Sequence, residues 1–156
     1  MRRRRRLGLA LAAGPLALVP LAALAGGAAA PGADVTVTVK NLRNAKGLVR
    51  ACMTTAPRAF PACEKDPAAH TASIDAAGAA HGISFRGVRP GTYAIALLHD
   101  ENANGKADFA LGMMPKEGFG FSRDARVRMG PPKFAEAAIA VGEEDRALAI
   151  TMRYIF

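Results

Sequence analysis

Hydrophobic and polar residues alternate most clearly in two stretches of this chain, and each alternation predicts a strand. In DVTVTVK, residues 34–40, valine alternates strictly with polar residues, which is typical of a strand with one buried face. In TYAIALLH, residues 92–99, one face holds Tyr93, Ile95 and Leu97 and the other holds Thr92, Ala94, Ala96 and Leu98. Because both of these faces are largely apolar, we expect a central strand buried against a second layer.

The rest of the pattern consists of short extended segments between turn residues. Further strands are predicted at LVRACMT (48–54), TASID (71–75) and HGISF (81–85), with a final pair at FAEAAIAVG (134–142) and ALAITMRYIF (147–156). Alanine and glutamate also favour helix, so FAEAAIA is alternatively a helical turn. The glycine- and proline-rich stretch 109–132 is predicted to be an ordered excursion packed on the sheets. Several short strands and few helices predict an all-β fold, an antiparallel β-sandwich.

The first thirty residues differ from the rest of the chain. A basic start, MRRRRR, precedes an apolar, alanine-rich run with small residues near its end, which is the layout of a secretory signal peptide. Cleavage is expected after Ala25, Ala28 or Ala30, and the alternative is an uncleaved membrane anchor. The sequence therefore predicts a signal peptide at 1–30, one domain at 31–156, and a periplasmic or secreted protein.

The net charge depends strongly on this segment. The whole chain has 21 basic and 13 acidic residues, a net charge of +8. Without Arg2 to Arg6, 16 basic residues stand against 13 acidic ones, a net charge of +3. No basic block with interleaved aromatic residues follows, so the composition argues against a nucleic-acid partner.

Two cysteines, Cys52 and Cys63, are the only ones in the chain. In an oxidising compartment an even pair is most simply a disulfide, which for so short a loop would stabilise by roughly 2–3 kcal/mol. A redox-active pair is the alternative, but the spacing is not that of a CxxC motif.

The stretch HDENANGKAD, residues 99–108, has the spacing of a calcium loop. Asp100, Asn102 and Asn104 place side-chain oxygens at alternate positions, and Gly105 follows where such a loop bends sharply. Asp108 falls at the ninth position, a further ligand position. The opposite interpretation is a tight polar turn, because Asp and Asn also hydrogen-bond their own backbone.

The other ligands would come from the same loop and from the chain beyond it. Lys106, at the seventh position, would offer its backbone carbonyl. Leu111 stands at the twelfth position in place of the glutamate of an EF-hand, so Glu117 would have to return to supply a carboxylate. The predicted ligand set, Asp100, Asn102, Asn104, Lys106, Asp108 and Glu117, would make a weak Ca²⁺ site.

The sequence also leaves two other kinds of functional site to consider, a catalytic site and an apolar binding site. His99 as a base and Ser122 as a nucleophile, oriented by Asp124 or Glu117, would suit a hydrolase, although no G-x-S-x-G motif surrounds Ser122. Both residues are alternatively structural. An apolar lip of Met113, Met114, Phe119 and Phe121 would suit a ligand or a protein partner, and the alternative is that these residues anchor the long loop to the core. The three histidines lack zinc-ligand spacing.

Several motifs resemble a known bacterial family. The run HDENANGKADFALGMMPKEGFGFSRD, the following GPPKFAEAAIAV, the upstream F-x-x-V-x-P-G-T-Y from Phe85 and the terminal I-T-M-R-Y are similar to the exported family catalogued as domain of unknown function 2141 (DUF2141). The matching positions in the loop region are His99, Asp100, Asn102, Asn104, Gly105, Asp108, Gly112, Pro115, Glu117, Gly118, Gly120, Phe121 and Ser122. The sequence departs from the expected pattern at Met113-Met114 and at Arg123.

The resemblance implies a fold and no established activity. The F-x-x-V-x-P-G-T-Y element is similar to that of prealbumin-like and carboxypeptidase-regulatory-like sandwiches, which implies seven strands in a Greek-key arrangement of two sheets. Residues expected to shape the long loop are Gly105, Pro115, Gly118, Phe121 and Ser122.

The leading hypothesis is an exported, non-enzymatic binding or structural module with a calcium-stabilised loop at 100–108. Its partner would be an unknown protein or a cell-envelope ligand, with membrane contact only through an uncleaved signal segment. The alternatives are a periplasmic hydrolase using His99 and Ser122, or a domain that recognises a protein partner.

Overall fold

The first sheet of the fold contains the strictly alternating segment. This computed structural model describes residues 32–110 and 114–155. The sheet has the strand order β10-β1-β4, made of β1 (Ala33–Lys40), β4 (Ile83–Val88) and β10 (Arg146–Thr151). Val35, Val37 and Val39 of β1 are buried and the residues between them are more exposed, as the alternation predicts.

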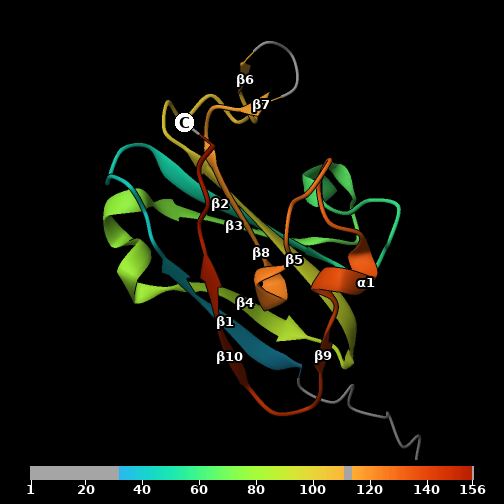
Figure 1. Cartoon of the computed structure of the whole chain (residues 1–156). Coiled ribbons are helices and arrows are strands. Elements are labelled where there is room, and N and C mark those ends of the chain that lie inside the picture. The colour runs from blue at the N-terminus through green and yellow to red at the C-terminus, as the bar shows by residue number, and fades with distance from the viewer. Residues whose placement is uncertain (1–31, 111–113, 156) are drawn as a thin grey trace, which may run out of the picture.

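The second sheet is built around β5 (Gly91–Asp100), the strand predicted to be central (Figure 1). Its order is β3-β2-β5-β8, with β3 (His70–Asp75), β2 (Leu48–Thr54) and β8 (Gly118–Phe121), and β9 (Ile139–Val141) pairs with the start of β5. Tyr93, Ile95 and Leu97 join the core between the sheets, whereas Ala94 and Ala96 join a second apolar cluster on the other face. The predicted burial of both faces of β5 is confirmed.

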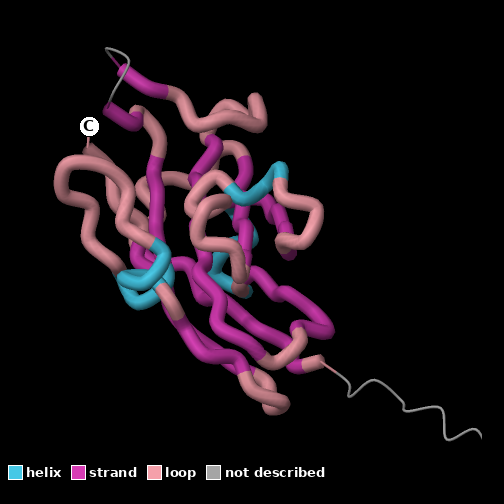
Figure 2. The backbone as a smooth tube through the Cα atoms, turned by 90° about the vertical axis from the view of Figure 1, so that its right-hand side faces the viewer, coloured by secondary structure: helices cyan, strands magenta, loops and turns pink. Residues whose placement is uncertain are grey.

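Loops and short helices cover the outer face of the second sheet. We call residues 55–69 and 122–137 the outer lobe; it includes the 3-10 helices η1 (Cys63–Lys65) and η3 (Ser122–Asp124) and the single turn α1 (Phe134–Ala137). The predicted disulfide between Cys52 and Cys63 is confirmed and ties η1 to β2. Figure 2 shows these helical segments at the periphery of the strands.

The all-β fold class is confirmed, but the strand arrangement differs from the predicted seven-stranded antiparallel sandwich. The two main sheets have three and five strands, because β8 and β9 share one edge of β5. A third, two-stranded sheet joins β6 (Phe109–Ala110) to β7 (Met114–Pro115). β1 pairs with β10 in parallel, so the sandwich is not purely antiparallel.

The two predicted final segments each contain a strand, β9 and β10, but these strands do not pair with each other. The segment from residue 134 begins with α1, which is the alternative helical turn, and continues as β9 in the second sheet. β10 instead pairs with β1 in the first sheet. The short turn 142–145 therefore carries the chain from one sheet to the other. The segment between the predicted strands TASID and HGISF forms the 3-10 helix η2 (Ala76–His81), which includes the first residue of HGISF.

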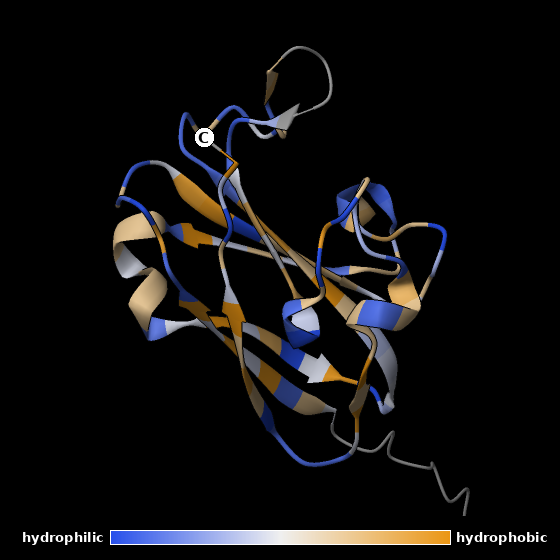
Figure 3. Ribbon diagram, viewed as in Figure 1, coloured by the Kyte–Doolittle hydropathy of each residue, from blue (hydrophilic) through white to orange (hydrophobic). Residues whose placement is uncertain are grey.

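Polar residues concentrate in the loops at the ends of the sandwich, whereas apolar residues gather on the strands (Figure 3). β5 leads directly from the core into the polar loop 101–108. The predicted signal segment 1–30, Gly112 and Met113 lie outside the described residues. No helix in the described part of the chain is long and apolar enough to cross a membrane.

Candidate functional site

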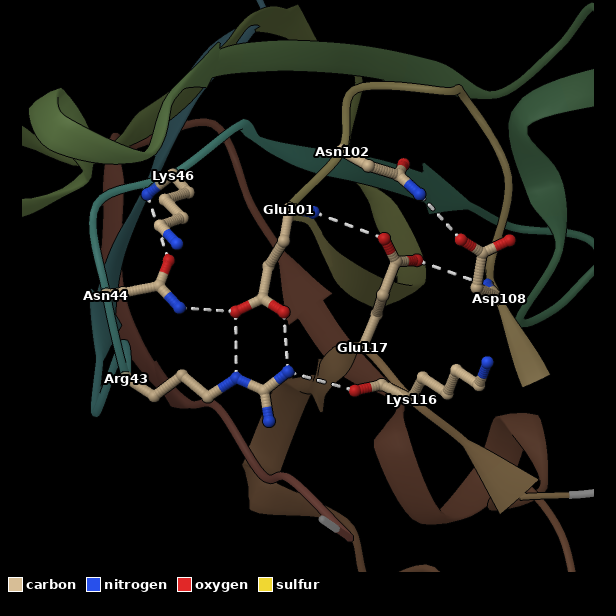
Figure 4. A pocket seen from close by; sticks show the side chains of 8 residues that line it. All are labelled: Arg43, Asn44, Lys46, Glu101, Asn102, Asp108, Lys116 and Glu117. Atoms are coloured by element: carbon tan, nitrogen blue, oxygen red, sulfur yellow. Dashed lines mark hydrogen bonds and ion pairs between the residues drawn. The ribbon is translucent and has the colours of Figure 1, made fainter. Parts of the chain in front are cut away.

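A polar pocket lies beside the loop that follows β5. Its volume is about 530 Å³, and Figure 4 shows the side chains that line it. They are Arg43, Asn44, Lys46, Glu101, Asn102, Asp108, Lys116 and Glu117. The pocket thus brings together three separate segments, the β1–β2 turn, the predicted calcium loop and the chain just before β8.

Asp100 supports the loop from beneath. Its side chain is fully buried and accepts hydrogen bonds from Arg50 Nε at 2.6 Å, Gly105 N at 2.8 Å and Asn104 N at 3.0 Å. Burial disfavours the Asp100 carboxylate, but these hydrogen bonds outweigh it and hold its pKa below the ordinary value. Gly105 has a φ of 79°, a backbone angle that glycine adopts without strain.

Asn102, Asn104 and Asp108 meet at the exposed side of the loop. Asn102 Nδ2 donates to Asp108 Oδ2 at 2.7 Å, and Asn104 Nδ2 donates to the same oxygen at 3.1 Å. The amide oxygens accept backbone N–H groups, Asn102 Oδ1 that of Asn104 and Asn104 Oδ1 that of Lys106. A carbonyl oxygen has two lone pairs, so each amide oxygen keeps one for a further donor or a cation. The Lys106 side chain itself is exposed.

Glu117 returns to the base of the same loop. It is 4% exposed, and its two carboxylate oxygens accept the backbone N–H groups of Glu101 at 3.2 Å and Asp108 at 3.1 Å. Burial raises the pKa of Glu117, and the nearby carboxylates of Asp100 and Asp108 raise it further. Glu117 therefore closes the loop by bonding the backbone at both of its ends.

An ion pair that the sequence reasoning missed forms the opposite wall of the pocket. Arg43 donates through Nε to Glu101 Oε1 at 2.8 Å and through Nη2 to Glu101 Oε2, and Asn44 Nδ2 donates to Glu101 Oε1 at 2.6 Å. The hydrogen bond from Arg43 is the main reason that the pKa of Glu101 falls to about 2. Arg43 also donates to the Lys116 carbonyl at 3.0 Å. No local motif links residues 43 and 101, so only the fold reveals this contact.

His99 is buried behind the pocket and is fully hydrogen-bonded. Its Nδ1 lies 2.8 Å from the Tyr154 hydroxyl and its Nε2 lies 2.8 Å from the Lys46 carbonyl. The Arg43 guanidinium lies over the Tyr154 ring, 4.5 Å from its centre. His99 thus joins the β1–β2 turn to the C-terminal segment.

Ser122 is buried in a different place. Its hydroxyl accepts the Ile95 N–H at 3.0 Å and donates to the Ala137 carbonyl. No hydrogen bond joins Ser122 to His99 in the described residues, and neither residue lines the polar pocket. The geometry therefore gives both residues structural hydrogen bonds.

Phe119 and Phe121 are the members of the predicted apolar lip whose side chains are described, and both pack against the protein interior. Phe121 is 5% exposed and lies in the outer cluster, 5.7 Å from Phe60 between ring centres. Phe119 packs against the same cluster. Gly118, predicted to shape the loop, allows a close approach, because a Cβ there would lie 2.3 Å from the Tyr154 ring.

The side-chain oxygens of the loop limit which metal ions it could bind. No group of three or more His, Cys, Asp or Glu side chains within the described ranges is placed to hold a metal ion. A cation in this loop would therefore depend on the amide oxygens of Asn102 and Asn104 as well as on Asp108.

A family model described as an uncharacterized protein conserved in bacteria (DUF2141) matches residues 37–149. The chain belongs to the DUF2141 family. All of the pocket-lining residues of this DUF2141 protein fall inside the matched range. No curated protein and no solved structure matches the chain.

Proposed function

We propose that this DUF2141 protein is an exported, non-enzymatic binding module whose loop 100–108 takes a calcium ion and so organises the polar pocket. The observation that carries the proposal is the convergence of Asn102, Asn104 and Asp108 on one side of the loop, with Glu117 bonded to the backbone behind them. Calcium prefers such oxygen ligands.

Each proposed ligand would have a distinct part. Asp108 would supply a half-buried carboxylate, and Asn102 and Asn104 would rotate so that the free lone pairs of their oxygens face the ion. The Lys106 carbonyl would complete the loop ligands. The ion would also reduce the electrostatic repulsion between the carboxylates of Asp108 and the buried Glu117.

Arg50 sets an upper limit on the affinity. Its guanidinium already balances the buried Asp100 carboxylate at 2.6 Å, so Asp100 adds little further attraction for a cation. With the Asp108 carboxylate and two amides as its side-chain ligands, the site belongs at the weak end of extracellular calcium sites, with a dissociation constant on the order of 10⁻⁴–10⁻³ M.

Three features support export and the type of sandwich. A disulfide between Cys52 and Cys63 is compatible with an oxidising compartment, and the predicted signal segment at 1–30 would deliver the chain there. The F-x-x-V-x-P-G-T-Y element from Phe85 supports a prealbumin-like type of sandwich.

The test is calcium titration by calorimetry, together with thermal melting in chelator and in millimolar calcium. Binding with a raised melting temperature is expected for the wild-type chain, because an ion that binds only the folded state stabilises it. Asp108→Asn should weaken calcium binding at least tenfold. Glu144→Gln, which removes a carboxylate from an exposed turn, is the matched control and should leave binding unchanged. Absence of heat and of a melting shift, or full affinity in the Asp108 variant, would overturn the proposal.

A further inference from the structure

A second pocket, separate from the polar one, lies in the outer lobe. It is a groove of about 520 Å³ and shares no lining residue with the polar pocket. One wall is residues 57–61 and the other is residues 131–135. The lining residues are Pro57, Phe60, Pro61, Pro131, Pro132, Lys133, Phe134 and Ala135.

The groove has a firm apolar floor. Phe60 is 8% exposed and packs edge-on against Phe121 and Phe134, with ring centres 5.7 and 6.2 Å apart. The disulfide at Cys63 ties the first wall to the sheet, and the Ser122 hydrogen bond to Ala137 ties the second wall. The two walls are therefore held at a fixed separation by covalent and buried polar contacts.

The chemistry of the walls selects against a peptide backbone. Four of the eight lining residues are proline, which has no N–H to donate. An extended peptide gains its affinity largely from main-chain hydrogen bonds, which this groove is poorly equipped to supply. A hydrocarbon chain needs no such bonds and gains from burial against proline and phenylalanine rings.

Each wall also carries one cation. Lys133 lines the groove, and Arg58 lies between the lining residues Pro57 and Phe60. The Arg58 side chain is exposed and forms no hydrogen bond or ion pair with another described residue. The neighbouring Glu136 carboxylate accepts the Lys133 backbone N–H at 2.7 Å but keeps its negative charge. The three side chains Arg58, Lys133 and Glu136 together carry a net charge of +1, so the rim of the groove favours an anionic group.

We propose that this groove binds a fatty acid, with its acyl chain on the proline and phenylalanine surface and its carboxylate between Lys133 and Arg58. This proposal is independent of calcium and of the polar pocket.

The test is calorimetric titration of the full chain with octanoate, in chelator and below the concentration at which octanoate forms micelles, with octanol as the neutral probe. Octanoate should bind, and octanol should bind at least threefold more weakly. Ala135→Trp, which fills the groove, should reduce octanoate affinity at least tenfold, and Lys133→Gln should reduce it about threefold. Lys116→Gln removes the same charge from the polar pocket and should have no effect.

A second blocking variant covers the case in which Ala135→Trp fails to fold. Pro57 is exposed, so Pro57→Glu should keep the fold while placing a carboxylate beside that of the ligand, and it should also reduce octanoate affinity at least tenfold. Thermal melting of each variant verifies folding. No octanoate binding, equal binding of octanol, or octanoate affinity unchanged in the folded groove variants would each overturn the proposal.

Discussion

The ion pair between Arg43 and Glu101 should make a pH-dependent contribution to stability that a single substitution removes. The pKa of Glu101 is about 2, against an ordinary value of 4.5, chiefly because Arg43 hydrogen-bonds the ionised form. At about 1.4 kcal/mol for each tenfold change in proton affinity, this difference corresponds to at most about 3–4 kcal/mol. Glu101→Gln keeps the size of the side chain and removes the charge.

The partial exposure of the pair lowers this figure. The side chain of Arg43 is 33% exposed and that of Glu101 is 20% exposed, so water screens part of the attraction. We therefore expect Glu101→Gln to lower the free energy of unfolding by about 1–2 kcal/mol at pH 7. Because the folded-state pKa is lowered, the contribution is fully present above pH 4.5 and is lost as the pH falls towards about 2.

The assay is urea denaturation of the wild type and the variant at a series of pH values from 7 to about 2.5. The difference between the two proteins should be largest at pH 7 and should shrink steadily below pH 4.5, because the carboxylate of the unfolded chain then binds a proton while that of the folded chain stays ionised down to about pH 2. Glu144→Gln, which removes a charge at an exposed turn, should show almost no difference at any pH. A difference for Glu101→Gln that stays constant as the pH falls would refute the ionic explanation.

Two further predictions concern the disulfide and the close packing of Gly118 against Tyr154. Replacing Cys52 and Cys63 together by alanine should lower the free energy of unfolding by about 2–3 kcal/mol, mainly because the unfolded chain regains the freedom of the closed loop. Equal urea midpoints for the variant and the oxidised wild type would contradict this. Gly118→Ala should cost about 1–3 kcal/mol, because its new Cβ would collide with the Tyr154 ring. In a Tyr154→Ala background the same substitution should cost much less, so an equal cost in both backgrounds would show that the collision is not the cause.

The sequence by itself determined the features that depend on local pattern. Strict alternation defined β1, and apolar residues on both faces identified β5 as the central strand, because the two-residue period of a strand is independent of its partners. The Cys52–Cys63 disulfide followed from cysteine number and spacing. The spacing of Asp, Asn and Gly located the polar loop, since these side chains bond backbone groups only a few residues away.

The tertiary structure decided which distant segments meet. β10 lies parallel to β1 and not beside β9, because the turn 142–145 crosses between sheets, and local propensity does not specify such a crossing. Arg43 and Arg50 reach Glu101 and Asp100 from segments some fifty residues earlier in the chain. Whether Asp100 faces a cation or Arg50 depends on the register of β2 against β5, which long-range packing sets.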